Sequence, residues 1–320
     1  MTNARRGDRL LSPEEFELHV AQAVRLEHVG VLLGAGASVA CGGKAMAALW
    51  TDFVAQYGDL ANKMAEQNFV PAPPETPNIE QALDKVAIAL SDAARTGLET
   101  GELIVMRDAL LRSVIGAAIL DGDWLNDPSS AGADHRLDSH VRMLTRLAHT
   151  RQPGQPAPWV FTTNYDMAVE LAAENASLHV RDGFRGFHDR VFTPSAFDLG
   201  LRNTEAQGEA QFGTYEVYLA KLHGSLSWTI GEDGGVRSEQ IRNIAPRLEE
   251  FLAGNTDESP GVLVFPSSAK FVDTVGFVYG ELMRRLTQFL SRPNVCLIVG
   301  GYGFGDNHLN RLLLSALNNP

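Results

Sequence analysis

The sequence predicts an α/β fold in which a Rossmann-like, mostly parallel sheet carries helices on both faces and receives an inserted all-helical block. Three observations predict this fold. Short, uninterrupted apolar runs recur along the chain, as in parallel strands that are buried on both faces. Segments with helical periodicity alternate with these runs. The long stretch between the first and second runs is helical throughout by the same criterion.

Composition and charge narrow the possible functions. The 320 residues are 44% apolar and 21% charged, which is enough to bury a sizeable core. There are 27 basic and 39 acidic residues, so the formal net charge is −12. Because nucleic-acid binding needs a basic face that neutralises phosphates, this balance argues against direct nucleic-acid binding, although a local basic groove remains open.

The cysteines and the apolar runs indicate a cellular compartment. Cys41 and Cys296 are too few and too far apart for a disulfide framework or a four-cysteine zinc site, and they suit a reducing cytosol. No apolar block follows the arginines near the N-terminus, and no apolar run approaches the roughly 20 residues of a bilayer span. We therefore expect a soluble, cytoplasmic protein without membrane contact.

The first helix is predicted over about residues 12–28. Ser12, Pro13 and Glu15 form the pattern of a reciprocal capping box. Phe16, Val20 and Val24 follow at four-residue spacing and predict one buried stripe. The first strand is predicted at residues 29–33.

The helical block is predicted to interrupt a single domain. Residues 1–50 and 156–320 are assigned to the Rossmann-like core, and residues 51–155 to the insertion. From about residue 44 onward the apolar spacing predicts helices around residues 46–53, after Asn78, and over about 98–120 and 135–149, with a proline-rich loop at 71–77.

The alternation of strands and helices resumes after the block. Strands are predicted at residues 159–162, 216–222, 261–265 and 295–299, with 226–230 pairing with 216–222. Helices are predicted at 167–175 and 275–290, and a last helix is indicated by an apolar stripe that ends near Leu317.

Four motifs follow predicted strands, where open parallel sheets bind their ligands. In chain order they are GAGAS at 34–38, TTNYD at 162–166, KLHGS at 221–225 and GYGFGD at 301–306. Small residues in the first and last allow a backbone to approach a diphosphate, and a histidine can serve as a general base near neutral pH. Neither the dinucleotide fingerprint G-x-G-x-x-G nor a Walker lysine pattern is present in the first loop.

Each motif also has a purely structural interpretation. The GAGAS loop can be a tight strand–helix turn, and Asp166 and Asp306 can cap the helices that follow them. A lone histidine such as His223 is more often structural than catalytic. The coincidence of four such motifs at strand ends favours a ligand site over any single motif.

Taken together, the four motifs in this order resemble the sirtuin-type NAD-consuming fold. Within that fold they are most similar to the bacterial sirtuin-like NAD hydrolases of antiphage defence. The resemblance runs from about Val29 to about Leu317, and it is specific at the motifs and loose between them.

The resemblance implies roles for individual residues. NAD would lie across the sheet as the substrate, with the GAGAS loop on its diphosphate. The implied catalytic residues are Asn164, which positions water and the nicotinamide ribose, His223 as general base, and the acidic Asp166. The implied cofactor-binding residues are Gly34, Ala35, Gly36, Ala37, Ser38, Thr163, Tyr165, Gly224, Ser225, Gly301, Phe304 and Asp306.

Two departures from the deacylase sirtuins favour water as the acceptor. Two cysteines cannot build the four-cysteine zinc module of those enzymes, so no metal is expected. Residues 41–45 read CGGKA where the deacylases continue G-I-P-x-F-R. The prediction is therefore an NAD glycohydrolase that releases nicotinamide and ADP-ribose.

Alternatives and partners complete the hypothesis. The main alternative is a subunit that senses NAD or ADP-ribose or acts as a scaffold without turnover, and a weaker one is protein ADP-ribosylation or deacylation. By resemblance we expect depletion of NAD in antiphage defence (abortive infection) by a homo-oligomer, with a possible partner such as a HerA-type ATPase or an Argonaute. The helical block or the arginine-containing N-terminus is the expected contact surface.

Overall fold

The computed structural model describes residues 4–71, 75, 77–120, 135–211, 215–256, 261–263 and 276–318. Parts of three predicted elements lie outside them, namely 72–74 and 76 of the proline-rich loop, 264–265 of the strand at 261–265, and 275 of the helix at 275–290. No described helix is both long enough and apolar enough to cross a bilayer.

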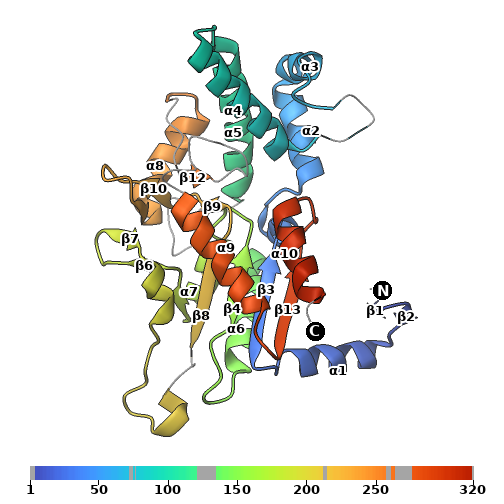
Figure 1. The fold of residues 1–320 in the computed structure, drawn as a ribbon, viewed down its shortest axis with the longest axis vertical. Coiled ribbons are helices and arrows are strands. Elements are labelled where there is room, and N and C mark those ends of the chain that lie inside the picture. Colours follow the sequence, from blue (N-terminus) through green and yellow to red (C-terminus); the bar gives the residue numbers. More distant parts are fainter. Residues whose placement is uncertain are drawn as a thin grey trace.

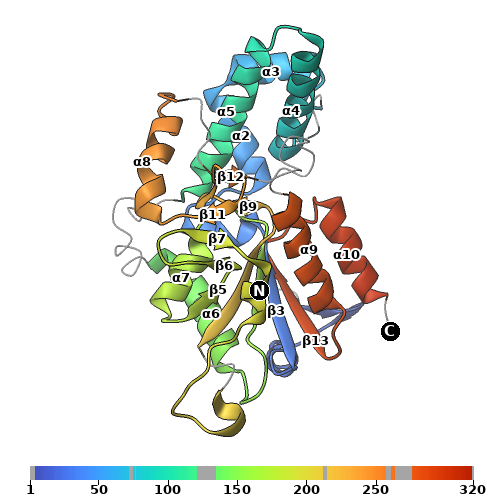
Figure 2. The same ribbon diagram turned by 60° about the vertical axis from the view of Figure 1, so that its left-hand side comes forward.

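A five-stranded, all-parallel sheet lies at the centre of the molecule, in the order β13-β3-β4-β8-β5 (Figures 1 and 2). Its strands are β3 (His28–Leu33), β4 (Trp159–Thr162), β5 (His179–Arg181), β8 (Glu216–Lys221) and β13 (Val295–Gly300). Four of them confirm predicted strands. The fifth, β5, has only three residues and none is fully buried, so it lacks the apolar run that predicted the others.

Helices cover both faces of this sheet, which confirms the Rossmann-like α/β prediction (Figure 2). On β3, Val31 and Leu33 belong to the core under one layer, whereas Leu32 belongs to the core under the other. Gly30 also faces that second layer, where an added Cβ would come within 2.8 Å of the Phe289 ring. The first layer is α6 (Asp138–His149) and α7 (Ala168–Asn175), and the second is α9 (Gly276–Leu290) and α10 (Asn307–Leu317).

Several helices form a lobe beyond the carboxyl edge of the sheet (Figure 1). They are α2 (Met46–Gln56), α3 (Gly58–Glu66), α4 (Ile79–Thr96), α5 (Gly101–Ala118) and α8 (Ile241–Leu252). One apolar core joins them, with Phe53, Leu110 and Phe251 among its fully buried side chains. The lobe includes α8, which lies outside the predicted insertion at 51–155. Helix α6 lies inside that range but packs on the sheet. Apolar periodicity predicts that a segment is helical, but it does not predict which core the helix joins.

A small antiparallel sheet holds the strand predicted at 226–230. β10 (Trp228–Ile230) pairs with β11 (Val236–Ser238) and not with β8, so that predicted pairing is wrong. The intervening segment contains Asp233 and Gly234, a dipeptide that favours a tight hairpin turn over a return to the parallel sheet. The sheet is completed by β7 (Arg190–Phe192) and β6 (Phe184–Arg185).

The strand predicted at 261–265 also lies outside the parallel sheet. The described part, β12 (Val262–Leu263), pairs antiparallel with β9 (Gly224–Ser225). The prediction of a strand is confirmed for these two residues, whereas its place in the parallel sheet is wrong. The remaining short elements are the 3-10 helices η1 (Ala35–Cys41), η4 (His135–Leu137), η5 (Pro194–Asp198) and η6 (Gly208–Gln211).

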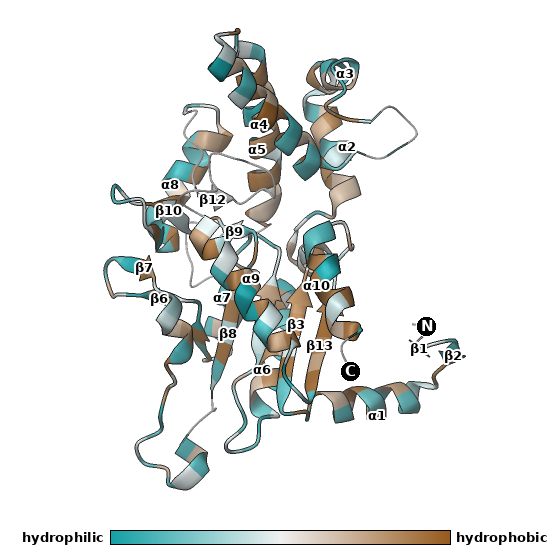
Figure 3. Cartoon of the chain, viewed as in Figure 1, coloured by the Kyte–Doolittle hydropathy of each residue, from teal (hydrophilic) through white to brown (hydrophobic). Residues whose placement is uncertain are grey.

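The N-terminal helix α1 (Pro13–Ala23) projects from the body of the molecule next to a hairpin of β1 (Arg5–Arg6) and β2 (Arg9–Leu10) (Figure 1). Its capping box at Ser12 and Glu15 is present as predicted. The predicted buried stripe is wrong: no residue of α1 is buried, and Phe16 and Val20 are 47% and 37% exposed. Caps are local and can be read from sequence, whereas burial needs a partner surface. Figure 3 shows the mixed hydropathy of this exposed helix beside the apolar strands of the sheet.

Candidate active site

The four predicted motifs begin along one line across the sheet. Gly300 of β13 pairs with Leu33 of β3, Leu33 with Thr162 of β4, and Thr162 with Lys221 of β8. Each of these residues is the last paired residue of its strand. The loops that follow therefore leave the same carboxyl edge side by side, where sheets of this type bind their ligands.

The glycines of the first and last motifs bring two loop backbones together. The N–H groups of Gly34 and Gly36 donate to the carbonyls of Gly300 and Gly301, at 3.0 and 2.9 Å. Gly301 has φ +64°, and a Cβ on it would come within 2.1 Å of the Ala37 nitrogen. Contact between the loops thus requires these glycines even before a ligand is considered.

Three side chains form a hydrogen-bonded chain between the first two motifs. Asn164 Nδ2 donates to Ser38 Oγ at 2.9 Å, and Ser38 Oγ donates to Asp166 Oδ2 at 2.7 Å. The other carboxylate oxygen of Asp166 accepts from the backbone N–H of Ala168 at the start of α7, at 3.0 Å. Ser38 and Asp166 are buried, at 2% and 6% exposure, and Asn164 is half-buried.

This chain fixes the orientation of the Asn164 amide. Nδ2 also donates to the Gly34 carbonyl at 3.1 Å, so both of its hydrogens are engaged. Within the described residues, Oδ1 has no hydrogen-bond partner and remains an acceptor. Asp166 acts on this amide only through Ser38, so its place in the structure is that of a support for Asn164.

Sequence reasoning did not single out the ion pair beneath the second motif. The Lys221 ammonium is 3% exposed and lies 2.9 Å from Glu170 Oε1. It also donates to the carbonyls of Tyr165 and Asp166. Burial raises the pKa of the Glu170 carboxyl, and Lys221 opposes that rise. The lysine of KLHGS thereby holds the TTNYD loop in place.

The histidine of the third motif pairs with the aspartate of the fourth. His223 Nε2 lies 3.0 Å from Asp306 Oδ2, and the two side chains are 4% and 9% exposed. Burial works to raise the pKa of the Asp306 carboxyl, but the hydrogen bonds from His223 and from the backbone N–H groups of Leu309 and His308 outweigh it, so that pKa lies below its ordinary value. His223 Nδ1 is buried, with no hydrogen-bond partner among the described groups.

Tyr165 links the TTNYD loop to the helical lobe. Its ring centroid is 6.5 Å from that of His223, and its hydroxyl donates to Glu80 Oε1, at 3.2 Å, on the first turn of α4. Burial, followed by Glu80, raises the pKa of Tyr165 well above its ordinary value. No sequence motif marks Glu80, so only the structure reveals that the lobe reaches the site.

A second buried histidine lies close to the same loops. His140 of α6 is 4% exposed, and its Nδ1 lies 3.7 Å from the Cys41 sulfur. Burial lowers the pKa of His140, and Asp166 opposes this shift. A single histidine within a helical pattern carries no distinguishing signal in sequence, and sequence reasoning missed it.

The other predicted residues divide into buried and open positions. Gly224 and Ser225 are buried in β9, where Ser225 Oγ lies 3.0 Å from Ser227 Oγ. Phe304 is 58% exposed and packs on Tyr302, with 4.9 Å between the two ring centroids. Thr163 is half-buried and donates its N–H to the Leu33 carbonyl, at 3.0 Å.

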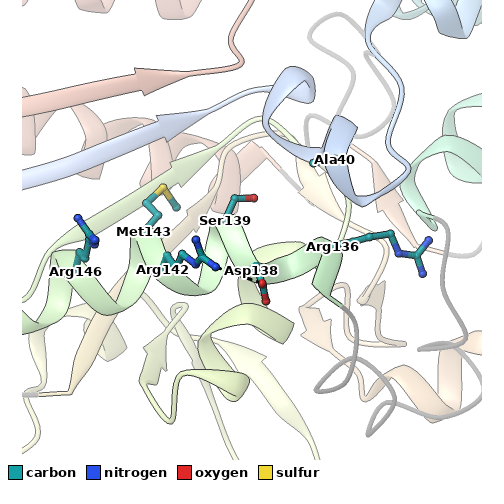
Figure 4. Close-up of a pocket in the computed structure, with 7 residues that line it drawn as sticks. All are labelled: Ala40, Arg136, Asp138, Ser139, Arg142, Met143 and Arg146. Atoms are coloured by element: carbon teal, nitrogen blue, oxygen red, sulfur yellow. Dashed lines mark ion pairs between the residues drawn. The ribbon is translucent and has the colours of Figure 1, made fainter. Parts of the chain in front are cut away.

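A groove of about 710 Å³ lies along α6 and the end of η1 (Figure 4). None of its lining residues is a predicted site residue. They are Ala40, Arg136, Asp138, Ser139, Arg142, Met143 and Arg146. Among the described residues, no group of three or more His, Cys, Asp or Glu side chains is arranged to hold a metal ion.

Comparison with family models finds a match over the second half of the chain. The family model described as "SIR2-like domain" matches residues 158–319, just over half of the chain. The matched region begins at β4 and contains the second, third and fourth motifs, while the GAGAS loop lies outside it. No curated protein matches the chain.

Proposed function

The chain belongs to the SIR2-like family, and on that premise we propose that it is an NAD hydrolase that releases nicotinamide and ADP-ribose. The family uses NAD, so the chain is tied to NAD chemistry in general. The proposal adds the reaction and its acceptor, water.

One observation carries the proposal. Asn164 and His223 follow neighbouring strands, each two residues beyond the paired residues Thr162 and Lys221. Neighbouring strands are about 4.8 Å apart, so both side chains start from the same small region of the carboxyl edge. Each keeps one polar atom, Oδ1 and Nδ1 respectively, that no described group engages. Hydrolysis of NAD requires a hydrogen-bond acceptor that positions the reactants and a base, and these two side chains can supply them from neighbouring strand ends.

Because nicotinamide is a good leaving group, cleavage of NAD needs few catalytic side chains. Nicotinamide in NAD is cationic, so its bond to the ribose C1′ can break with both electrons moving to the ring nitrogen, without protonation. Ordinary glycosidases need a carboxylic acid for that step. A site for NAD therefore has to supply orientation, a desolvated pocket and a base near pH 7.

His223 is proposed as that base. As water forms its bond to C1′, one water proton passes to Nδ1, which gives ADP-ribose, neutral nicotinamide and a proton that is later released to solvent. An orphaned buried ring nitrogen is destabilising unless a ligand or water satisfies it, which supports a functional role.

Asn164 is proposed to hold the water or the ribose hydroxyls through Oδ1. Because Gly34 and Ser38 engage both amide hydrogens, the Asn164 amide cannot rotate by 180° without losing two hydrogen bonds. Asp166 then contributes as a positioning residue through Ser38, rather than by touching the substrate.

The glycine loops are proposed to receive the diphosphate. Ala35 and Gly36 are exposed at the start of η1, and Gly301 and Phe304 lie on the loop packed against it. The N–H groups of Gly34 and Gly36 are engaged by the contact between the loops, so the N–H of the exposed Ala35, at the start of η1, is the group that phosphate oxygens would approach. Gly224, Ser225 and Tyr165 are buried, and they support this proposal only as the framework of the site.

Self-association is proposed with a second copy of this chain. The chain exposes apolar side chains on the projecting helix α1 and also on β13, the last strand at one edge of the sheet, where Ile298 and Val299 are 36% and 38% exposed. Two unpartnered apolar surfaces on one chain suit association between copies. On the resemblance of the motifs alone, we also propose a role in antiphage defence in the cytoplasm, with or without an ATPase or Argonaute partner.

An NAD turnover assay with product analysis tests the function. We expect the wild type to form nicotinamide and ADP-ribose, and Asn164→Ala and His223→Ala each to lose on the order of 10²–10⁴ in rate. His179→Ala, an exposed histidine at the start of β5, is the matched control and should keep full activity. Equal hydrolysis by all four proteins would refute the assignment. Calorimetric binding of NAD without product would indicate a sensor, and labelled acceptor proteins would indicate ADP-ribose transfer.

A further inference from the structure

The contact between His223 and Asp306 determines which ring nitrogen of His223 is left free. An ionised carboxylate only accepts hydrogen bonds, so His223 Nε2 must carry the hydrogen that lies between the two groups. In a neutral imidazole the other nitrogen, Nδ1, then has no hydrogen and offers a lone pair. This is the nitrogen that is buried without a partner among the described groups.

Contacts on both carboxylate oxygens fix the orientation of the Asp306 side chain. While Oδ2 faces His223, Oδ1 accepts from the backbone N–H groups of His308 and Leu309 at 2.7 and 3.1 Å, and so caps α10. Rotation that released the imidazole would also break the helix cap. One side chain therefore fixes both the start of α10 and the histidine.

The pairing also joins opposite ends of the site. Asp306 follows β13 and His223 follows β8, and β3 and β4 lie between these strands in the sheet. The loop of residues 301–306 must therefore pass over two strand ends, about three strand spacings of 4.8 Å, to reach the imidazole. A link of that length is not required to cap a helix, because a cap is satisfied locally.

We propose that Asp306 is a positioning residue that holds His223 as the Nε2–H tautomer and thereby makes Nδ1 the base atom. The part about the base rests on the proposed NAD hydrolysis, whereas the part about the tautomer does not. Asp306, predicted from sequence as a cofactor-binding residue, would then act on the reaction through His223.

The tyrosines around this pair have raised pKa values and keep their hydroxyl protons near neutral pH. Tyr165 packs beside His223, and Tyr279 of α9 and Tyr302 lie in the field of Asp306. Burial, followed by Asp306, raises the pKa of Tyr279 and of Tyr302 to about 12, so both phenols stay protonated. Glu80 reaches Tyr165 from α4.

The test is Asp306→Asn. The asparagine oxygen can still cap α10, but its NH₂ group faces Nε2 as a donor, which forces the hydrogen of His223 onto Nδ1. Nitrogen NMR of protein with labelled histidine should show the Nε2–H tautomer for His223 in the wild type and Nδ1–H in the variant. We expect kcat to fall by on the order of 10⁴, as it does for the same change in the serine-protease triad, with KM little altered.

Two further variants separate this role from a structural one. Asp306→Glu keeps a carboxylate and should retain the Nε2–H tautomer and part of the activity. Asp92→Asn, at a carboxylate on α4 that is 64% exposed, is the matched control and should change neither the spectrum nor the rate.

The proposal is overturned if His223 carries its hydrogen on Nδ1 in the wild type, or keeps one tautomer in both proteins. It is also overturned if Asp306→Asn turns over NAD within threefold of the wild type. Absence of NAD turnover in the wild type would refute the proposed hydrolysis alone, because the NMR spectra still decide the tautomer.

Discussion

Asn164 Nδ2 lies 2.9 Å from Ser38 Oγ although 126 residues separate the two in sequence. Ser38 has a single hydroxyl hydrogen, which it gives to Asp166, so it can only accept from the asparagine. The direction of both hydrogen bonds is therefore fixed. The GAGAS and TTNYD loops are joined by this arrangement, and the asparagine oxygen is left for a ligand.

Ser38→Ala is expected to uncouple Asn164 from Asp166. The loss of one hydrogen bond, worth about 1 kcal/mol net, lets the amide rotate and should lower kcat by roughly fivefold with little change in KM. The buried Asp166 oxygen left unpaired should reduce the free energy of unfolding by about 1–3 kcal/mol. Steady-state kinetics and chemical denaturation measure the two effects.

The control for this change is Ser315→Ala on the exposed surface of α10, which should alter neither quantity. An unchanged kcat in Ser38→Ala would mean that the orientation of Asn164 does not depend on the serine.

Gly301 and Gly303, two of the three glycines of the GYGFGD loop, should respond differently to alanine. Gly301→Ala puts a Cβ 2.1 Å from the Ala37 nitrogen at φ +64°, so the loops must separate, and we expect a loss above about 2 kcal/mol in unfolding free energy. Gly303→Ala meets no atom within 4 Å and should stay within about 0.5 kcal/mol of the wild type. Thermal denaturation of both variants checks this, and NAD affinity should fall only for Gly301→Ala. Similar stabilities for the two variants would contradict the contact between the loops.

The parts of the site that sequence predicts are those determined locally. An apolar run that ends in glycine or polar residues locates the end of a strand, and the ends at Leu33, Thr162, Lys221 and Gly300 do form one line. The caps at Ser12 and Asp306 are likewise set by residues within one turn. These features need no knowledge of the partner strand or helix.

Contacts between distant loops could not be predicted in the same way. The pairing of His223 with Asp306 spans 83 residues and depends on a loop crossing two strand ends. Glu80 and His140 reach the site from helices whose sequence patterns say only that they are helices. The predicted buried stripe on α1 is wrong for the same reason, since Phe16 has apolar neighbours in sequence but is left 47% exposed by the part of the chain that the structure describes.

Lys221→Met should destabilise the protein in a pH-dependent manner. The change leaves the largely buried Glu170 carboxylate without its cation and removes two bonds to the TTNYD loop, so we expect a loss of up to about 3 kcal/mol near neutral pH. Burial already raises the pKa of Glu170 above its ordinary 4.5, and without the opposing lysine it should rise further. The folded variant then binds a proton more readily than the unfolded chain. Its free energy of unfolding therefore falls as the pH rises from the ordinary pKa of Glu170 through the raised pKa in the folded state.

Denaturation at pH 5 and pH 8 measures this dependence for Lys221→Met. The deficit relative to wild type should be smaller at pH 5, where Glu170 is closer to neutral. Adding Glu170→Gln should remove most of the pH dependence, because no buried charge is left. A deficit that is equal at both pH values would show that the lost bonds to the loop, and not the carboxylate, account for the effect.

Helix α1 should be needed for association between copies of the chain. Phe16 and Val20 lie one turn apart, and glutamates at both positions would place two charges in any apolar contact that they make. Light scattering across a range of concentrations should give a multiple of 34.7 kDa for the wild type and the monomer mass for Phe16→Glu with Val20→Glu. Gln22→Glu adds charge about 240° around the helix from Phe16 and should leave the assembly intact. A wild type that stays at the monomer mass throughout would rule out this surface as a contact between copies, and an oligomer unaffected by the double change would move the contact to the open edge at β13.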